Sequence, residues 1–348
     1  MKYPVAGLAL VLLITGCASS DDLGRVGSLD FYDWLQMRRG EYNVALDNND
    51  LDLRARKEVQ ITTEVQKRYD LVAEQAVNAT DPERRDIAIF ALGFSRRPEA
   101  VAHLTPALSD PIPQVRASAA AAIGYLAPVR PPVAELGKLL SDADGYVRLA
   151  GLFALKQVLP EGQETPLADR VIEMFTDEAD PNIRNEAAYV LGRIKLKRLV
   201  PILVKKGLAD ASWLVRRSTC IALGWFGPEG EEAVPFLIER LKDPESVVVE
   251  TAHWALKKIT GRVDADRQYT SWFDWHNEQA KIIEYVCLKC SIVNSVGGIC
   301  SKCGARMESR STGIEYICPN DPEVNSPRPG KCAKCQKELL PNRRKAPK

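Results

Sequence analysis

The chain has 348 residues, 45% of them hydrophobic, and its 47 Lys and Arg residues nearly balance 46 Asp and Glu residues, for a formal net charge of +1. This composition is typical of a globular chain. It excludes a disordered polyelectrolyte and the strongly basic balance expected of a nucleic-acid-binding domain.

Residues 1–17 form a predicted export signal. Lys2 gives a positive start, and Val5–Ile14 is an apolar stretch that is too short to span a bilayer but suits the core of a signal peptide. The stretch runs into Thr15-Gly16-Cys17, which resembles a bacterial lipobox. The resemblance implies cleavage before Cys17 and a covalent lipid on that residue; the alternative is an ordinary signal peptide with an incidental cysteine.

A lipid on Cys17 would make the protein a lipoprotein of the bacterial cell envelope. Each buried CH₂ of an acyl chain contributes about 0.8 kcal/mol, so several chains anchor a protein without a transmembrane helix. In lipobox proteins, Ala18 rather than Asp after the cysteine implies the outer membrane, facing the periplasm, rather than the inner membrane.

Residues 18–80 are predicted to form a tether and an N-terminal capping helix. Leu29–Met37 is rich in aromatic residues, and Arg54–Thr80 has apolar residues at helical spacing among many charges. A cap would hide the apolar face of the first repeat that follows. The alternative is a docking helix for a partner.

A repeated pattern dominates residues 81–261. The copies share an Asp, a short turn, a small residue and then Ala-Leu-Gly or a close variant, and most of them have Val or Ile followed by Arg before the small residue. The copies are anchored, roughly 32 residues apart, at Arg85, Arg116, Arg148, Arg184, Arg216 and Val249. A period of this size predicts a mainly α fold, an α-solenoid of about six two-helix repeats.

The residue types within each copy have local roles. Asp-Pro suits a helix start, because Asp accepts hydrogen bonds from free amides and Pro fits the first turn. Alanines three and four residues apart give a face for close helix packing. The Gly that follows Ala-Leu is predicted to end the helix.

These copies resemble the short bacterial HEAT repeats first described in phycobilisome lyases. The resemblance implies a structural ladder of Asp and Arg side chains between neighbouring repeats. The residues at its positions are Asp110, Arg116, Asp142, Arg148, Asp180, Arg184, Asp210 and Arg216. The alternative is a row of arginines that binds a ligand.

Residues 262–284 are predicted to form a capping helix rich in tryptophan. Tyr269, Trp272, Phe273 and Trp275 lie close together there. Large aromatic side chains can cover the open end of a repeat array. The alternative is an aromatic box for a ligand.

Residues 285–305 contain two Cys-x-x-Cys pairs, Cys287 with Cys290 and Cys300 with Cys303. Two such pairs at this spacing predict a small β-hairpin of the zinc-ribbon type, with a structural Zn²⁺ held by four thiolates. In so short a unit, metal binding would supply most of the folding energy, about 10–16 kcal/mol.

Residues 314–341 contain Cys318, Cys332 and Cys335 in a pattern that resembles the heavy-metal-binding module of copper and silver efflux proteins. That module has Met-His where this chain has Asn320-Asp321, so the soft ligands that suit copper are missing. Cys318, Asp321, Cys332 and Cys335 then form a candidate zinc site with three sulfurs and one oxygen. A basic tail, residues 342–348, follows.

Disulfides are the competing interpretation of these cysteines. An exported protein meets an oxidising compartment in which thiols pair. The first unit has enough cysteines for two bridges, whereas the second has three and leaves one unpaired.

No catalytic constellation is present in the sequence, which predicts a protein that is not an enzyme. The leading hypothesis is a membrane-anchored scaffold that binds protein partners through the repeat surface. The alternatives are a metal-binding or metal-sensing envelope protein acting through the Cys-rich tail, and a lyase-like accessory factor. Neither a nucleic acid nor a small-molecule substrate is expected.

Overall fold

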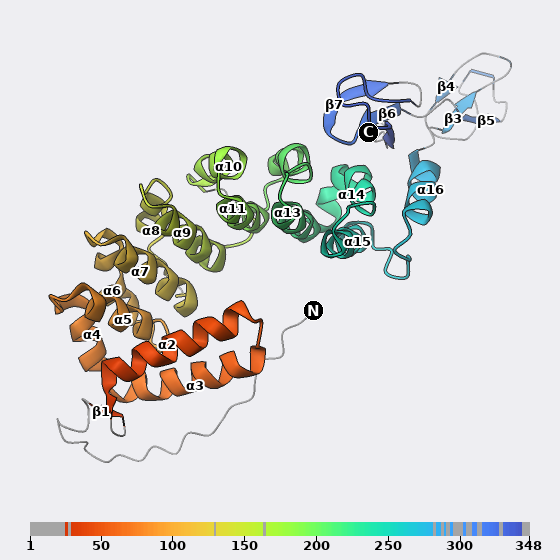
Figure 1. Ribbon diagram of the computed structural model, residues 1–348. Coiled ribbons are helices and arrows are strands. Elements are labelled where there is room, and N and C mark those ends of the chain that lie inside the picture. The colour runs from red at the N-terminus through yellow and green to blue at the C-terminus, as the bar shows by residue number, and fades with distance from the viewer. Residues whose placement is uncertain are drawn as a thin grey trace. The chain divides into compact units, whose positions relative to one another are not determined.

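The structure is a computed structural model of the chain (Figure 1). It describes residues 25–26, 29–128, 130–162, 165–280, 283–286, 289, 293–294, 302–303, 308–311, 315–326 and 330–342. The chain divides into two compact units, residues 1–128 and residues 129–348.

The first unit begins with a two-stranded hairpin and continues as helices. Asp30 starts the first long helix, because its side chain accepts a hydrogen bond from the amide of Tyr32. Phe31 and Leu35 of that helix are fully buried. The sequence predicted a single capping helix within residues 18–80, whereas the structure has three helices there. The elements are β1 (Arg25–Val26), β2 (Leu29–Asp30), α2 (Phe31–Asp47), α3 (Leu51–Lys67), α4 (Tyr69–Asn78), α5 (Pro82–Leu92), α6 (Ala100–Leu104), the 3₁₀ turn η1 (Pro106–Ser109) and α7 (Pro113–Leu126).

The second unit contains the later repeats. Its helical elements are α8 (Val133–Leu139), α9 (Gly145–Val158), α10 (Ala168–Asp177), α11 (Pro181–Ile194), η2 (Lys197–Leu199), α12 (Val200–Ile202), the π-helical turn η3 (Leu203–Gly207), α13 (Trp213–Trp225), η4 (Gly227–Ala233), α14 (Val234–Arg240), α15 (Ser246–Thr260) and α16 (Tyr269–Ala280). The inner helices α9, α11, α13 and α15 pack each against the next (Figure 1). Ala187, Ala222 and Ala255 are fully buried in them, since alanine lets neighbouring helices approach closely. The predicted mainly helical repeat fold is confirmed.

Gly192 and Gly224 have a different role from the predicted one, whereas Gly93 directly follows the end of α5, as predicted. Gly93 has an ordinary helical φ of −58°, and Gly192 and Gly224 lie inside α11 and α13, so these glycines do not end their helices by adopting a left-handed conformation. A Cβ on Gly192 would lie 2.8 Å from the Cβ of Ala222, and one on Gly224 would lie 2.3 Å from the ring of Trp254. Glycine is required there because the next repeat packs directly on the backbone.

The C-terminal part of the second unit contains two small antiparallel sheets. One has the order β4-β3-β5, built from β3 (Ile283–Val286), β4 (Val293–Asn294) and β5 (Glu308–Ser311). The other has the order β7-β6-β8, built from β6 (Glu315–Cys318), β7 (Asp321–Ser326) and β8 (Leu340–Asn342). Before them, Trp272 of α16 is fully buried and its indole NH donates to the carbonyl of Asp266 at 2.8 Å.

Within the described residues, no helix is sufficiently long and apolar to cross a bilayer.

Candidate functional site

Each ladder arginine first holds the turn that precedes its own inner helix. The Nη1 atom of Arg148 donates to the carbonyls of Asp142 and Ala143, six and five residues earlier, at 3.0 and 3.2 Å. Arg85, Arg116, Arg184 and Arg216 make the same two bonds in their own repeats. Backbone carbonyls that would otherwise be left without donors at the turn are satisfied in this way.

The remaining guanidinium nitrogens of four of these arginines form bidentate pairs with a carboxylate of the next repeat. The paired donor–acceptor distances fall between 2.7 and 3.2 Å. The pairs are Arg85 with Asp110, Arg148 with Glu178, Arg184 with Asp210, and Arg216 with Asp243. Bidentate geometry is the strongest form of an arginine–carboxylate contact, so each pair fixes the orientation of adjacent repeats.

One predicted ladder residue is replaced in the structure. The carboxylate of Asp180 accepts from the amide of Asn182 and caps α11, while Glu178 accepts both hydrogen bonds from Arg148. The acid that pairs in the ladder lies six residues before the arginine of its own repeat, which is the position of Glu178 relative to Arg184. The residue that caps the inner helix lies four residues before that arginine, and Asp180 occupies this cap position.

The predicted ladder also left out Asp243 and the anchor residue Arg85, which both belong to it. Asp243 stands six residues before the anchor Val249, and a constant offset of six from each anchor would have found it. Its side chain is 1% exposed, the most buried acid of the four pairs. Burial acts to raise the pKa of Asp243, but hydrogen bonds from Arg216 and from the amide of Glu245 outweigh burial and hold that pKa below its ordinary value.

The exposed face of the inner helices of the second unit carries a row of half-buried residues that the sequence analysis did not identify. The row, named the inner-face row, lies five positions after each anchor and consists of Phe153, Tyr189, Ile221 and Trp254. Lys156 lies 5.2 Å from the ring of Phe153 and 5.1 Å from that of Tyr189. Comparing the residues that lie five positions after each anchor in the sequence would have found the row.

Cationic and aromatic groups alternate along this row. The Nη1 atom of Arg217 donates to the hydroxyl of Tyr189 at 3.3 Å, and the ring of Tyr189 lies 5.8 Å from that of Trp225. Lys258 lies 6.0 Å from the ring of Trp254. Tryptophan, tyrosine and arginine are the residue types that contribute most binding energy at protein interfaces.

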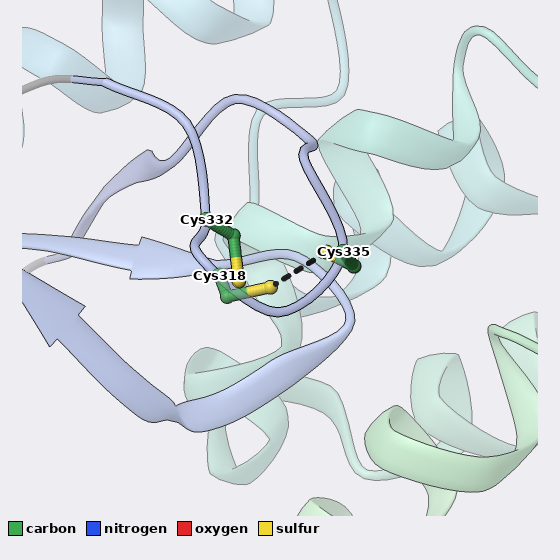
Figure 2. A group of neighbouring side chains, drawn as sticks. All are labelled: Cys318, Cys332 and Cys335. Atoms are coloured by element: carbon green, nitrogen blue, oxygen red, sulfur yellow. Dashed lines mark hydrogen bonds between the residues drawn. The ribbon is translucent and has the colours of Figure 1, made fainter.

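Three of the predicted metal ligands come together in the second Cys unit (Figure 2). Cys318 ends β6, Cys332 and Cys335 lie on the loop before β8, and their sulfur atoms all lie within 4.8 Å of one another. The sulfurs of Cys318 and Cys335 are 3.4 Å apart. Ligands of a tetrahedral thiolate site with Zn–S bonds of about 2.3 Å lie about 3.8 Å apart, so the cluster fits one metal ion with little rearrangement.

Backbone amides support the sulfurs of this cluster. The amide of Asn320 donates to the sulfur of Cys318 and that of Lys334 to the sulfur of Cys332, each at 3.4 Å. Such bonds stabilise thiolates and orient them toward a metal. The amide of Cys335 and then other hydrogen bonds lower the pKa of Cys332, whereas burial raises the pKa of Cys318 to about 12. A bound cation favours the charged form of all three, because it is the largest local charge in such a site.

The cluster does not contain a disulfide. Cys318, Cys332 and Cys335 are thiols, and the shortest separation quoted above exceeds a disulfide bond length of about 2.05 Å. A single bridge here would leave the third thiol buried beside it, whereas one metal ion would engage all three.

Asp321, the predicted fourth ligand, lies outside the sulfur cluster. Its Oδ2 atom accepts from the ammonium of Lys334 at 2.9 Å, and its Oδ1 atom accepts from the amide of Glu323 at 3.2 Å. The hydrogen bond from Lys334 is the largest influence on this carboxyl and holds its pKa below the ordinary value. Its assignment as a metal ligand stays a prediction.

The other predicted cysteine sites are only partly described. Cys17, Cys287, Cys290 and Cys300 lie outside the described residues, and Cys303 is exposed. Cys220 is fully buried in α13, and burial raises its pKa to about 12, so it acts as a small apolar core residue.

Comparisons with protein families identify both parts of this architecture. A model described as HEAT repeats matches residues 69–156 and 203–267, and a model described as a heavy metal binding domain matches residues 315–342. The comparison with curated proteins found no significant match. Residues 69–156 and 203–267 are therefore similar to HEAT repeats, and residues 315–342, named the metal-binding module, are similar to a heavy metal binding domain.

Solved structures of several repeat proteins are similar to the chain. The Escherichia coli protein YibA shares 20% identity, with 72% of this chain and 97% of that one covered and a TM-score of 0.45. The complex of CpcE and CpcF of phycocyanin lyase from a Nostoc species shares 17% identity, with coverages of 60% and 93% and a TM-score of 0.42. A designed armadillo repeat protein shares 20%, with coverages of 54% and 98% and a TM-score of 0.40. At these values the likenesses carry no argument about function.

Proposed function

We propose that the protein is a non-enzymatic scaffold, anchored in the bacterial envelope by a lipid on Cys17, that binds a protein partner through the inner-face row. The observation that carries the proposal is the periodic partial exposure of large apolar residues at one position of successive inner helices. Phe153, Tyr189, Ile221 and Trp254 are all half-buried at one position of successive repeats. A large side chain is not present at this position of every repeat, because the corresponding residue in α7 is Ala121.

The charges beside the row indicate the chemistry of the partner. Lys156 forms an ion pair with Glu186 at 2.6 Å, whereas Arg217 is directed to the hydroxyl of Tyr189 and Lys258 is exposed beside Trp254. A partner segment that presents carboxylates next to apolar side chains would satisfy these cations and cover the rings. A protein surface is therefore a better match than a small molecule.

Envelope anchoring is supported by the sequence of residues 1–17, where a short apolar stretch leads into Thr15-Gly16-Cys17. Outer-membrane attachment facing the periplasm is the location proposed. Replacing Cys17 with Ser is expected to move the protein from the membrane fraction to the soluble fraction of the cell.

Site-specific photo-crosslinking in cells of the source organism tests the partner surface. A photoreactive residue in place of Ile221 is expected to capture a defined protein, and the same residue in place of Lys206, which is exposed on η3, is expected to capture none. Trp254→Ala should weaken the captured interaction at least tenfold, since buried tryptophans at interfaces contribute about 2 kcal/mol or more.

The matched control for that variant is Trp213→Ala. Trp213 is 44% exposed at the first turn of α13, outside the row. Its loss should leave binding unchanged, and thermal melts should show that both variants are folded. Equal capture from positions 206 and 221, or equal loss of binding in both tryptophan variants, would refute the proposed surface.

We also propose, as the second function, that the Cys318–Cys332–Cys335 cluster binds Zn²⁺. Three converging sulfurs with amide hydrogen bonds suit a thiophilic divalent ion, and residues 315–342 contain neither the Met nor the His ligands that favour copper. Metal analysis of the purified full chain, together with thiol titration, tests this assignment. Bound zinc and protected thiols would support it, and metal-free protein with disulfides would refute it.

A further inference from the structure

Two turns of the metal-binding module have the same local design. In Cys318-Pro319-Asn320-Asp321 and in Cys332–Cys335, the sulfur of the first residue accepts from the amide two residues later, at 3.4 Å in both turns. Asp321 therefore occupies in the first turn the position that Cys335 occupies in the second. Cys318 and Asp321 are also cross-strand partners at the β6–β7 turn, which places their side chains on one face.

The second turn also provides an ammonium group that binds the same carboxylate. Lys334 lies between the two ligands Cys332 and Cys335, and its Nζ atom is 2.9 Å from the Oδ2 of Asp321. The other oxygen of Asp321 accepts from the amide of Glu323. Both carboxylate oxygens are thus engaged, and neither belongs to the cluster in which all three sulfurs lie within 4.8 Å of one another.

We propose that Lys334 holds Asp321 away from a metal ion bound by Cys318, Cys332 and Cys335, so that the module is an open three-sulfur site. This inference rests on the proposed metal binding and adds the state of the fourth position. Closed sites with four protein ligands hold structural metals, whereas sites with three protein ligands keep a position for water or an exogenous ligand. An exogenous thiol entering that position would let the ion be exchanged between this module and another carrier.

The charges favour competition between Lys334 and the metal for one carboxylate. Asp321 can bind the metal through Oδ2 only by giving up or sharing its hydrogen bond with Lys334. The alternative is that Lys334 orients Asp321 as a fourth ligand, as supporting hydrogen bonds do in closed metal sites. The two arrangements predict opposite effects of removing the ammonium group.

Metal titration of the full chain distinguishes them. All variants carry Ser at positions 287, 290, 300 and 303, so that only the second unit binds Co²⁺ or Zn²⁺. Zinc affinity is measured by competition with a chelator, and the d–d and thiolate charge-transfer absorption of Co²⁺ reports the coordination number and the sulfur ligands. Cobalt binding by this parent protein itself shows that the module is folded.

Lys334→Gln is expected to raise zinc affinity up to about fivefold, because an exposed ion pair contributes about 1 kcal/mol or less. It should also slow the transfer of zinc to the chelator and convert the Co²⁺ spectrum to that of a four-coordinate site with an added oxygen ligand. Asp321→Asn should change the affinity of the parent less than twofold, and in the double variant the effect of Lys334→Gln should disappear. Lys337→Gln, which removes the same charge from an exposed position of the same loop, should have no effect.

Several results would overturn the inference. A loss of affinity of tenfold or more in Asp321→Asn would show that Asp321 is already a ligand, and weaker binding in Lys334→Gln would show that Lys334 supports it. An equal rise in zinc affinity for Lys334→Gln and Lys337→Gln would show that the effect comes from the change in net charge and not from the contact between Lys334 and Asp321. A parent protein that binds neither Co²⁺ nor Zn²⁺ would refute the proposed metal function as well, whereas normal binding with no effect of Lys334→Gln would refute only this inference.

Discussion

The repeats of the second unit and the metal-binding module distribute their stability differently. Between α9 and α15 each repeat buries alanine, leucine and valine side chains against its neighbour and adds a bidentate arginine pair. In the described part of the module, the buried cluster has Cys318, Cys332 and Leu339 at its centre, with Tyr316 and Val324 beside it. Two of the three central residues are cysteines.

This difference has a thermodynamic consequence. Repeat arrays are stabilised by a sum of similar interfaces, so the loss of one contact removes only a fraction of the total. A small metal module depends on one ion, whose binding free energy is its folding free energy. The two regions should therefore respond separately to chelators and to substitutions.

The largest effect is expected from removing the metal from the module. Cys332→Ser, or a strong chelator, should unfold residues 315–342, because metal binding would supply most of the folding free energy of so small a module. The helical circular dichroism of the repeats should remain. Metal content and amide exchange of the module are the measurements.

Cys220→Ala is the matched control, since Cys220 is a buried thiol of α13 outside the module. It should lower the melting temperature of the repeats slightly and leave the metal content unchanged. If Cys332→Ser abolished the cooperative melt of the repeats, the two regions would not be energetically separate.

A smaller effect is expected from the ladder. Arg216→Ala should destabilise the repeats by about 3 kcal/mol, because it leaves Asp243 as a buried carboxylate without its main partner. Arg85→Ala should lose about 2 kcal/mol, since Asp110 remains 11% exposed and can be hydrated. Urea unfolding measures both values, and a larger loss for Arg85→Ala would contradict the role of burial.

The same pair makes stability depend on pH in acid. The folded pKa of Asp243 lies below the ordinary value of 3.8, so its stabilisation is fully present above that value and is lost as the pH falls through the folded pKa. Asp243→Asn should remove this part of the acid dependence. An unchanged slope of unfolding free energy against pH below about 4 in that variant would show that other carboxylates dominate.

A comparable or smaller effect is expected from a substitution that disturbs the close packing on glycine. Gly224→Ala should destabilise the repeats by about 1–3 kcal/mol, because its Cβ would lie 2.3 Å from Trp254. Gly40→Ala is the control, since Gly40 lies inside α2 with nothing within 4 Å of its added Cβ. That variant should stabilise α2 by about 0.5–1 kcal/mol, and destabilisation by both would refute the packing explanation.

Much of the helical fold was predictable because its signals are local. The repeat period, the turn before each inner helix and the spacing of Cys332 and Cys335 all depend on residues close together in the sequence. The roles of Gly192 and Gly224 were not predictable in this way. Their neighbours belong to the following repeat, and the distance between them depends on how the helices pack.

The sequence by itself determined that the chain is a helical repeat protein and that Cys318, Cys332 and Cys335 are candidate ligands of one metal, since periodicity and short spacing survive any arrangement of the repeats. Tertiary structure alone decided that Asp321 is bound to Lys334, whereas the offset of six residues from Arg184 already favours Glu178 over Asp180 as the partner of Arg148. Side chains of charged residues reach several partners of opposite sign, and only the packed backbone sets which carboxylate lies within hydrogen-bond distance.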